Sequence, residues 1–351
     1  MRRSTLVVVV VMLSLGLAAC GRSGESLAKN TGEASGAFPV TVEHEYGTTT
    51  VAAATQRVVS LGFKDQDWLY AFGVSPVAVR KWYGLFPNEI NPWAESHVVG
   101  QPPAVLEEID YEKIAALRPD LIVSVYSGIT GQEYQELSRI APTVAGPVGS
   151  TDYNEPWRDV TRLIGTALGQ PQRAETMITE IDGLFAKAKQ RHPGLVSAEV
   201  STAYAWSPDS IGVYTSGDPR PKFLAELGIQ TPQAVDKLAG VDTFHASISP
   251  ELVADTFDLA DDAVVVIGSP NADEPGAHTA LQNTTFSSSR VANQGRVVFL
   301  DTTLSDVAFS FASPLSIPFT LEHLVPRLAA AIDGDPATAV PAAPGTFEAG
   351  K

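Results

Sequence analysis

Cysteine is almost missing from this chain, since Cys20 is the only one among 351 residues. A single cysteine cannot form an internal disulfide, and without another cysteine after residue 20 the body of the chain has no thiol nucleophile. Histidine is scarce as well, with no pair at i, i+4 and no spacing typical of a metal site. This scatter argues against a zinc or manganese site rich in histidine. The six histidines are His44, His97, His192, His245, His278 and His323.

Motifs of common enzyme classes are also missing. The chain has no Gly-x-Ser-x-Gly elbow, no phosphate loop and no Gly-x-Gly-x-x-Gly after a predicted strand. A missing motif does not exclude hydrolysis, so a cleft enzyme stays an alternative. Basic residues are also few, since 24 Lys and Arg stand against 40 Asp and Glu, which gives a net charge of −16. This balance argues against nucleic acid or an anionic membrane surface as a partner.

The first nineteen residues have the layout of a secretory signal. Arg2 and Arg3 precede an apolar run from Leu6 to Leu17, and small residues lead up to Cys20. The run is too short, and flanked wrongly, for a membrane span. We therefore expect residues 1–19 to be a signal peptide.

The residues around the cysteine, Leu17-Ala18-Ala19-Cys20, resemble the lipobox of bacterial lipoproteins. This resemblance implies a lipidated Cys20 that anchors the chain to the extracytoplasmic face of the cell membrane. The alternative is an ordinary signal peptide with a chance cysteine. Residues 20–38 are rich in Gly and Ser and predict a flexible tether. Residues 334–351 are rich in Ala, Pro and Gly and predict a disordered tail.

Both halves of the remaining chain alternate short apolar strands with helical stretches. Continuous apolar strands joined by helices are typical of a parallel sheet covered on both faces. We expect an α/β fold with an N-terminal lobe over residues 39–155, opening with a hairpin around Tyr46-Gly47-Thr48, and a C-terminal lobe over 193–333. The predicted strands are Val58–Leu61, Val77–Val79, Leu121–Val125, Thr202–Trp206, Ser210–Tyr214, Ala263–Ile267 and Arg296–Leu300.

Residues 156–192 predict a helical connector between the lobes. A first helix runs from Pro156 to Leu168 and ends at Gly169. A second helix, over residues 171–191, opens on Pro171 and carries an apolar stripe. At 1.5 Å per residue it forms a rod of about 30 Å, the width of a small domain. Two lobes joined by such a rod suit a binding protein whose domains barely close.

Five segments spread along the chain form an ordered set: Gln56–Gly62, Phe72–Val77, Ile114–Ile122, Gly295–Asp301 and Ser313–Pro318. They resemble landmarks of the class III, helical-backbone substrate-binding proteins of ABC importers, in an actinobacterial-like lipoprotein form. The resemblance runs from about Phe38 to Ile332. It implies two lobes with central parallel-rich sheets joined by one long backbone helix. It also implies a cleft between the lobes that binds an iron(III)–siderophore complex, delivery to the permease subunits and a monomeric state.

Residues that follow predicted strands are the main candidates for ligand contact, because ligands of open α/β sheets bind beyond the carboxyl ends of the strands. In the loop Arg80-Lys81-Trp82-Tyr83, cations can donate to the oxygens around iron and aromatic rings can cover the carbon skeleton. We expect the iron to arrive already chelated, so that the protein supplies no metal ligand and holds no cofactor. The candidates are Lys64, Arg80, Trp82, Tyr83, Trp93, Tyr126, Trp206, Tyr214 and Arg220.

The resemblance also implies that Glu112 and Glu251 dock on arginines of the two permease subunits. Each glutamate follows a predicted helix start, capped by Asp110 or Ser249, where the helix dipole alone stabilises a carboxylate by about 0.3–1 kcal/mol. Other functions stay open at this point. A haem- or cobalamin-binding protein of the same fold is one, since a tyrosine can ligate haem. An adaptor without a usable cleft is another.

Overall fold

The structure, a computed structural model, describes residues 38–82, 84–207, 210–239, 243–259, 263–268, 283–300, 305–333, 335 and 337–340. These residues belong to one compact unit, Ala34–Lys351. Cys20, Tyr83, the predicted signal peptide and most of the predicted tether and tail lie outside the described residues. We refer to residues 38–155 as the N-terminal half and to residues 193–340 as the C-terminal half.

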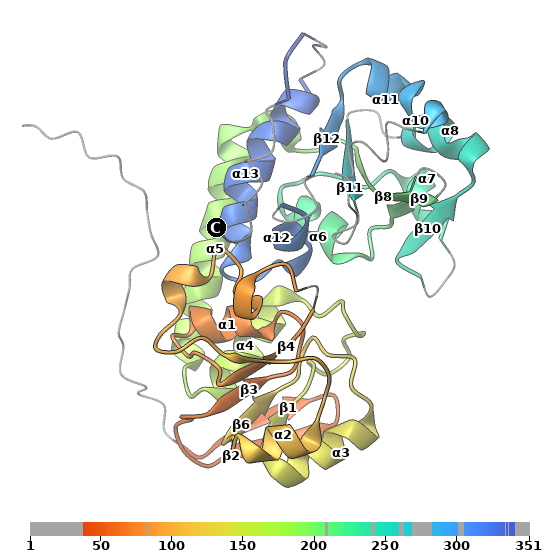
Figure 1. Ribbon diagram of the computed structural model, residues 1–351. Helices are drawn as coiled ribbons and strands as arrows, with labels where there is room; N and C mark the ends of the chain where they lie inside the picture. Colours follow the sequence, from red (N-terminus) through yellow and green to blue (C-terminus); the bar gives the residue numbers. More distant parts are fainter. Residues whose placement is uncertain are drawn as a thin grey trace, which may run out of the picture. The chain divides into compact units, whose positions relative to one another are not determined.

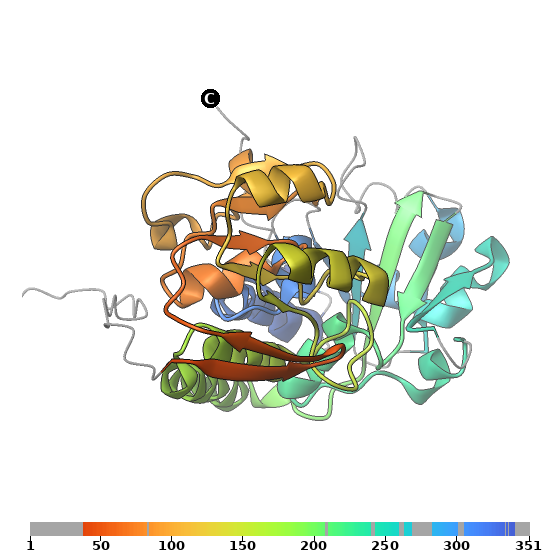
Figure 2. The same ribbon diagram turned by 90° about the horizontal axis from the view of Figure 1, so that it is seen from below.

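The chain opens with the predicted hairpin. Strand β1 (Val40–His44) pairs antiparallel with β2 (Gly47–Val51). Alternate side chains of both strands are buried, as the period of two requires. Gly47 opens the second strand at φ 119°, a conformation that residues with a Cβ rarely adopt. Figure 2 shows the hairpin lying beside the green helix α4 (Trp157–Ala167), which β1 contacts.

The N-terminal half is built on a five-stranded sheet with the order β5-β4-β3-β6-β7, and every neighbouring pair in it is parallel. The central strands β3 and β6 are buried along their whole length, which explains their continuous apolar sequence. This sheet confirms the predicted α/β class (Figure 1). Its elements are β3 (Val58–Ser60), α1 (Asp65–Ala71), β4 (Ala78–Arg80), η1 (Pro87–Glu89), η2 (Glu95–His97), β5 (Ala104–Leu106), α2 (Tyr111–Ala116), β6 (Leu121–Val123), α3 (Gly131–Ile140) and β7 (Thr143–Val144).

The C-terminal half holds a second five-stranded sheet with the order β10-β9-β8-β11-β12. Strands β8, β11 and β12 are parallel, whereas β9 pairs antiparallel with β8 and β10. The sheet is therefore parallel-rich, as the resemblance implies, and β9 is its reversed strand. Only two residues separate β8 from β9, and a parallel crossover needs a dozen or more. The strands are β8 (Val200–Ser207), β9 (Ser210–Tyr214), β10 (His245–Ile248), β11 (Ala263–Gly268) and β12 (Val297–Phe299).

Short helices surround this second sheet, and a long one closes the described part of the chain. They are η3 (Pro193–Leu195), α6 (Pro219–Glu226), α7 (Gln233–Asp236), η4 (Pro250–Leu252), α8 (Val253–Phe257), α10 (Thr284–Ser287), α11 (Arg290–Asn293), α12 (Ser305–Phe311) and α13 (Ser316–Ala331). No helix in the described part of the chain combines the length and the apolar character needed to cross a membrane.

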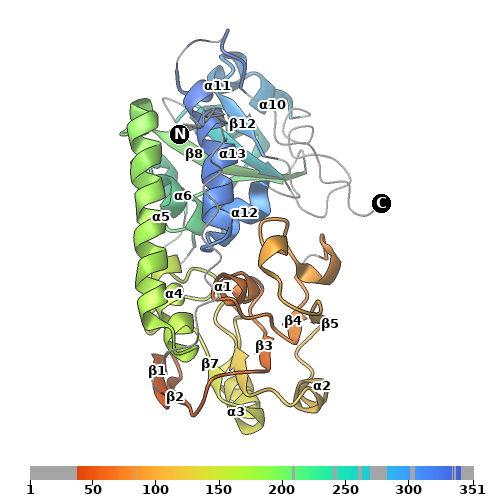
Figure 3. The ribbon, with the colours of Figure 1, turned by 90° about the vertical axis from the view of Figure 1, so that its left-hand side faces the viewer.

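The connector consists of α4 and α5 (Pro171–Arg191), close to the predicted bounds of both helices. Gly165 lets the two helices approach, because a Cβ at this position would lie 2.7 Å from the Cβ of Ala174. Figure 3 shows α5 running past α4 and along α13, which it contacts. Arg158 of α4 forms ion pairs with Asp182 of α5, at 2.5 Å, and with Glu226 of α6. The connector is thus tied to both halves.

Candidate ligand-binding site

Aromatic side chains from the loops after β3, β4 and β6 meet at one edge of the N-terminal sheet. The Trp82 ring lies edge-on to Phe63 at 4.7 Å and stacks on Tyr126 at 5.8 Å. Tyr153, from the segment between β7 and α4, reaches Tyr126 at 5.2 Å and Phe63 at 6.2 Å. We call these four residues the aromatic cluster. The carboxyl ends of the parallel strands therefore bring Trp82 and Tyr126 together, as the sequence predicts.

Two cations lie against this aromatic cluster. The ammonium nitrogen of Lys64 is 3.7 Å from the centre of the Tyr126 ring, and only 3% of the residue is exposed. The guanidinium carbon of Arg80 is 4.1 Å from the centre of the Phe63 ring, and its Nη1 donates to the Ser127 carbonyl at 3.2 Å. Both contacts have cation–π geometry. The edge of the sheet thus combines flat apolar surfaces with positively charged hydrogen-bond donors.

Buried carboxylates compensate for part of this charge. Burial lowers the pKa of Lys64, and the Glu155 and Asp65 carboxylates oppose that change. Burial raises the pKa of Glu155, and Lys64 opposes it in turn. Burial also raises the pKa of Asp65 to about 6, although its carboxylate accepts from the backbone N–H groups of Val125 and Tyr126. The site is therefore a small group of ionisable side chains removed from water.

A glycine makes room for one of these carboxylates. A Cβ at Gly62 would lie 2.1 Å from Oδ2 of Asp65. No side chain fits at that distance, so residue 62 must be glycine for Asp65 to reach the end of β6. Asp65 and Asp67 lie in a polar run, Lys64–Asp67, between two apolar segments. That contrast is the signal by which both residues could have been found.

Trp93 joins the site from the segment between η1 and η2. Its indole N–H donates to Oδ2 of Asp67 at 2.6 Å, and its ring lies 5.5 Å from Phe319 of α13. Phe311, at the end of α12, lies 6.1 Å from Trp93 and 5.6 Å from Trp82. Phe311 follows no predicted strand, and no pattern in the sequence singles it out. It links Trp93 to the aromatic cluster.

Arg220 belongs to the C-terminal half but acts on the same site. Its guanidinium carbon lies 4.4 Å from the centre of the Tyr214 ring, and it pairs with Asp218 at 3.2 Å. The positive charge of Arg220 contributes to the lowered pKa of Lys64. Tyr214 is 6% exposed and packs on Tyr204 at 5.3 Å, so it lies mainly in the core beneath Arg220.

Trp206 and Tyr214 do not share an edge of the C-terminal sheet. The antiparallel register pairs Tyr214 with Thr202, whereas Trp206 lies beside the turn at the other end of the hairpin. Each residue is a candidate because it ends a predicted strand, but β9 reverses the direction of the chain, so the two strands end at opposite edges. The side chain of Trp206 lies outside the described residues.

Glu112 and Glu251 are both exposed, one in each half. Asp110 caps α2 as predicted, since its carboxylate accepts from the backbone N–H of Lys113 at 3.0 Å. Ser249 occupies the corresponding position before η4 but makes no side-chain cap. The predicted cap at Ser249 is therefore wrong, because its hydroxyl bonds to the Glu251 carboxylate. A backbone N–H and this hydroxyl together lower the pKa of Glu251.

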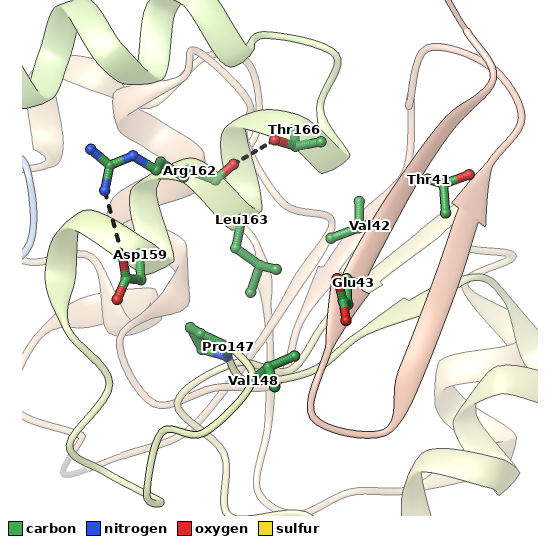
Figure 4. A pocket seen from close by; sticks show the side chains of 9 residues that line it. All are labelled: Thr41, Val42, Glu43, Pro147, Val148, Asp159, Arg162, Leu163 and Thr166. Atoms are coloured by element: carbon green, nitrogen blue, oxygen red, sulfur yellow. Dashed lines mark hydrogen bonds and ion pairs between the residues drawn. The ribbon is translucent and has the colours of Figure 1, made fainter.

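A concave region of about 490 Å³ contains none of the predicted ligand-binding residues in its lining (Figure 4). It is lined by side chains of β1, of α4 and of the Pro147-Val148 segment. A second region, of about 430 Å³, lies between β2 and α3 and contains none of the candidates either. Across the described residues, no group of three His, Cys, Asp or Glu side chains is arranged to hold a metal ion. The chemistry typical of a ligand site is therefore concentrated at the aromatic cluster.

Comparison with known proteins places this geometry in a family. The chain matches the family described as "Periplasmic binding protein" over residues 58–304. It belongs to that family. A solved relative, the periplasmic solute binding protein from Mycobacterium smegmatis str. MC2 155, is 32% identical with a TM-score of 0.74, over 84% of this chain and 98% of that chain. The α/β fold with its connecting helices is the fold of this periplasmic binding protein family.

Two of the curated relatives of this periplasmic binding protein come from Bacillus subtilis (strain 168). YhfQ, described as a putative ABC transporter substrate-binding lipoprotein, is 29% identical over 195 residues, which are 54% of this chain and 57% of the relative. The match thus spans little more than half of that relative's length. FhuD, described as an iron(3+)-hydroxamate-binding protein, is 23% identical over 321 residues, which are 91% of this chain and 95% of the relative.

Proposed function

We propose that this periplasmic binding protein captures an iron(III)–siderophore complex at the aromatic cluster and delivers it to an ABC importer. The observation that carries the proposal is the position of Lys64 and Arg80 against the rings of Tyr126 and Phe63. A siderophore presents an apolar skeleton around an oxygen-rich metal centre. Rings that cover the skeleton and cations that donate to the oxygens suit such a ligand. The name of FhuD, an iron(3+)-hydroxamate-binding protein, supports the same substrate class, and the name of YhfQ supports delivery to an ABC transporter.

The iron arrives already chelated in this proposal, and the protein acts by binding and not by catalysis. Chelated ferric iron needs no further ligand, so the protein contributes hydrogen-bond donors and apolar surface. Arg80 donates to one backbone carbonyl, and a guanidinium has five N–H donors in total, so it has capacity for ligand oxygens.

Delivery completes the proposal. The chain works as a monomer held at the extracytoplasmic face of the membrane by lipid on Cys20. Glu112 and Glu251 dock on the permease subunits. Their exposure, one in each half of the protein, supports this role because a docking carboxylate must be accessible to a cation on the partner.

Tryptophan fluorescence of the purified protein tests the substrate class. The titrants are a ferric hydroxamate, a ferric catecholate, haemin and cyanocobalamin. Trp82 and Trp93 lie in the site, so we expect saturable quenching by one of the ferric siderophores. Tight binding of haemin or cyanocobalamin, with no response to either siderophore, would overturn the substrate and favour the haem or cobalamin alternative. A hydrolysed ligand would overturn the assignment as a binding protein.

A further inference from the structure

The turn from Phe311 to Ser313 lies on the candidate site. The Phe311 carbonyl accepts a hydrogen bond from the Lys64 ammonium at 3.0 Å, between residues 247 positions apart in the sequence. The Phe311 ring lies 5.6 Å from the Trp82 ring, and Phe311 is 4% exposed. One residue of the C-terminal half therefore contacts both the buried cation and the central ring of the aromatic cluster.

Neighbouring residues hold this turn in place. The Ser313 hydroxyl donates to Oδ2 of Asp67 at 2.8 Å, and Ser313 is fully buried. Between them, Ala312 has φ 47°, in the left-handed region that residues with a Cβ avoid. Such a conformation persists only where surrounding contacts impose it. Here Phe311 and Ser313 contact the N-terminal half on either side of Ala312, and the Ser313 hydroxyl also accepts from the backbone N–H of Ser316.

A siderophore bound at this site would need the same partners. It would place an oxygen near the Lys64 ammonium, where the Phe311 carbonyl now lies. It would also place an apolar face on Trp82, which the Phe311 ring now covers in part. The Lys64 ammonium has three donors and can serve the turn and the ligand together, whereas the part of the Trp82 ring that Phe311 covers can be used by only one of them.

We propose that Phe311 is an internal competitor that sets the affinity of the site for its ligand. This inference rests on the proposed function. The Phe311 carbonyl accepts one hydrogen bond from the buried Lys64 ammonium, and the Phe311 ring covers part of Trp82. A ligand binds by displacing the ring from Trp82 and by adding an acceptor oxygen to the remaining donors of Lys64. It must therefore carry an acceptor oxygen next to an apolar face.

Substitution of Phe311 gives the direct test. The dissociation constants of a ferric hydroxamate and a ferric catecholate are measured by calorimetry on the full-length chain in detergent. Loss of a competing aromatic contact in Phe311→Ala is expected to lower the dissociation constant about tenfold. Phe311→Leu keeps apolar volume in the core and is expected to lower it about threefold. This second variant serves if Phe311→Ala fails to fold.

Phe319→Ala is the matched control. Phe319 packs on Trp93, as Phe311 does, but has no described ring contact with Trp82. Its removal is expected to change the dissociation constant by less than about twofold. The proposal is overturned if the Phe311 variants do not bind the ligand more tightly than the wild type. Equal affinity would mean that Phe311 has no effect on binding, and weaker affinity would mean that Phe311 itself contacts the ligand.

Failure of the proposed function can be distinguished from failure of this inference. If the wild type and all Phe311 variants ignore both siderophores, the substrate class is wrong and the competitor has no ligand to exclude. If only the Phe311 variants bind, the turn excludes the ligand almost completely, which supports the inference.

Discussion

The ammonium nitrogen of Lys64 lies 3.7 Å above the Tyr126 ring, and the opposing ring of Trp82 stacks on the same tyrosine at 5.8 Å. A buried cation, a phenol and an indole thus form one continuous surface at the ends of β3, β4 and β6. The predictions below test what each member of this surface contributes and how the surrounding carboxylates and exposed glutamates take part.

Lys64→Met should weaken siderophore binding by about 10- to 100-fold, because a hydrogen bond from a charged donor contributes about 1.5–3 kcal/mol. Calorimetric titration measures the effect. Lys81→Met is the control, since the Lys81 side chain is 40% exposed and pairs with Glu107. Equal losses in both variants would show that general positive charge, and not the buried ammonium, attracts the ligand.

Trp82→Ala should raise the dissociation constant of the siderophore at least tenfold, because the ligand loses its central apolar surface. Calorimetry is the suitable method, since the substitution also removes a fluorescent reporter. Trp157→Phe, in the connector helix α4, should leave the affinity unchanged within about twofold. Full affinity in Trp82→Ala would place the ligand elsewhere.

Asp67→Asn should lower the free energy of unfolding by about 1–3 kcal/mol at pH 7. The Asp67 carboxylate accepts from Trp93, Asn91 and Ser313, and an amide nitrogen in place of one oxygen would face donors. Ser313→Ala removes one of these bonds and should cost about 1 kcal/mol. Urea unfolding measures both. A larger loss for Ser313→Ala would contradict the central place of Asp67 in this network.

The buried acids should make the protein less stable as the pH rises from about 4 to about 6. Burial raises the pKa of Asp65 and of Asp67 to about 6, from an ordinary value of 3.8. The folded state therefore holds more protons than the unfolded state in this window, and the free energy of unfolding falls with rising pH. His44, whose pKa burial lowers from 6.5, contributes with the opposite sign towards the upper end of the window.

Asp67→Asn tests the contribution of one of these acids. It should reduce the fall in the free energy of unfolding between pH 4 and pH 6. Asp110→Asn is the control. Hydrogen bonds at the start of α2 lower the pKa of Asp110, whose side chain is partly exposed, from its ordinary 3.8, so it titrates below this window. Unfolding curves at several pH values give the slopes. An unchanged slope in Asp67→Asn would mean that Asp67 is ionised throughout.

Glu112→Lys and Glu251→Lys should abolish iron uptake by cells while leaving siderophore affinity and stability nearly unchanged. Both side chains are exposed, so the free energy of unfolding should change by less than about 0.5 kcal/mol. Reversed charge would repel a cationic partner. Glu95→Lys, at an equally exposed position, is the control. Normal uptake by the double variant would contradict the docking role.

Local sequence pattern determined most of the secondary structure of this protein. The hairpin around Gly47 and the helix Pro171–Arg191 have the predicted positions, because apolar periodicity and end residues act within a few positions of the chain. The sequence also predicts that Trp82 and Tyr126 lie close together, because each follows a strand and parallel strands end at one edge of a sheet.

Tertiary packing alone decided the rest of the site. The reversed strand β9 separated Trp206 from Tyr214, since strand direction depends on pairing and not on composition. Tyr153 and Phe311 reach the aromatic cluster from a loop and a helix end that carry no periodic signal. The contact between Lys64 and Phe311 joins residues 247 positions apart. No local pattern encodes such a contact, because it forms only when the two halves of the chain bury their surfaces against each other.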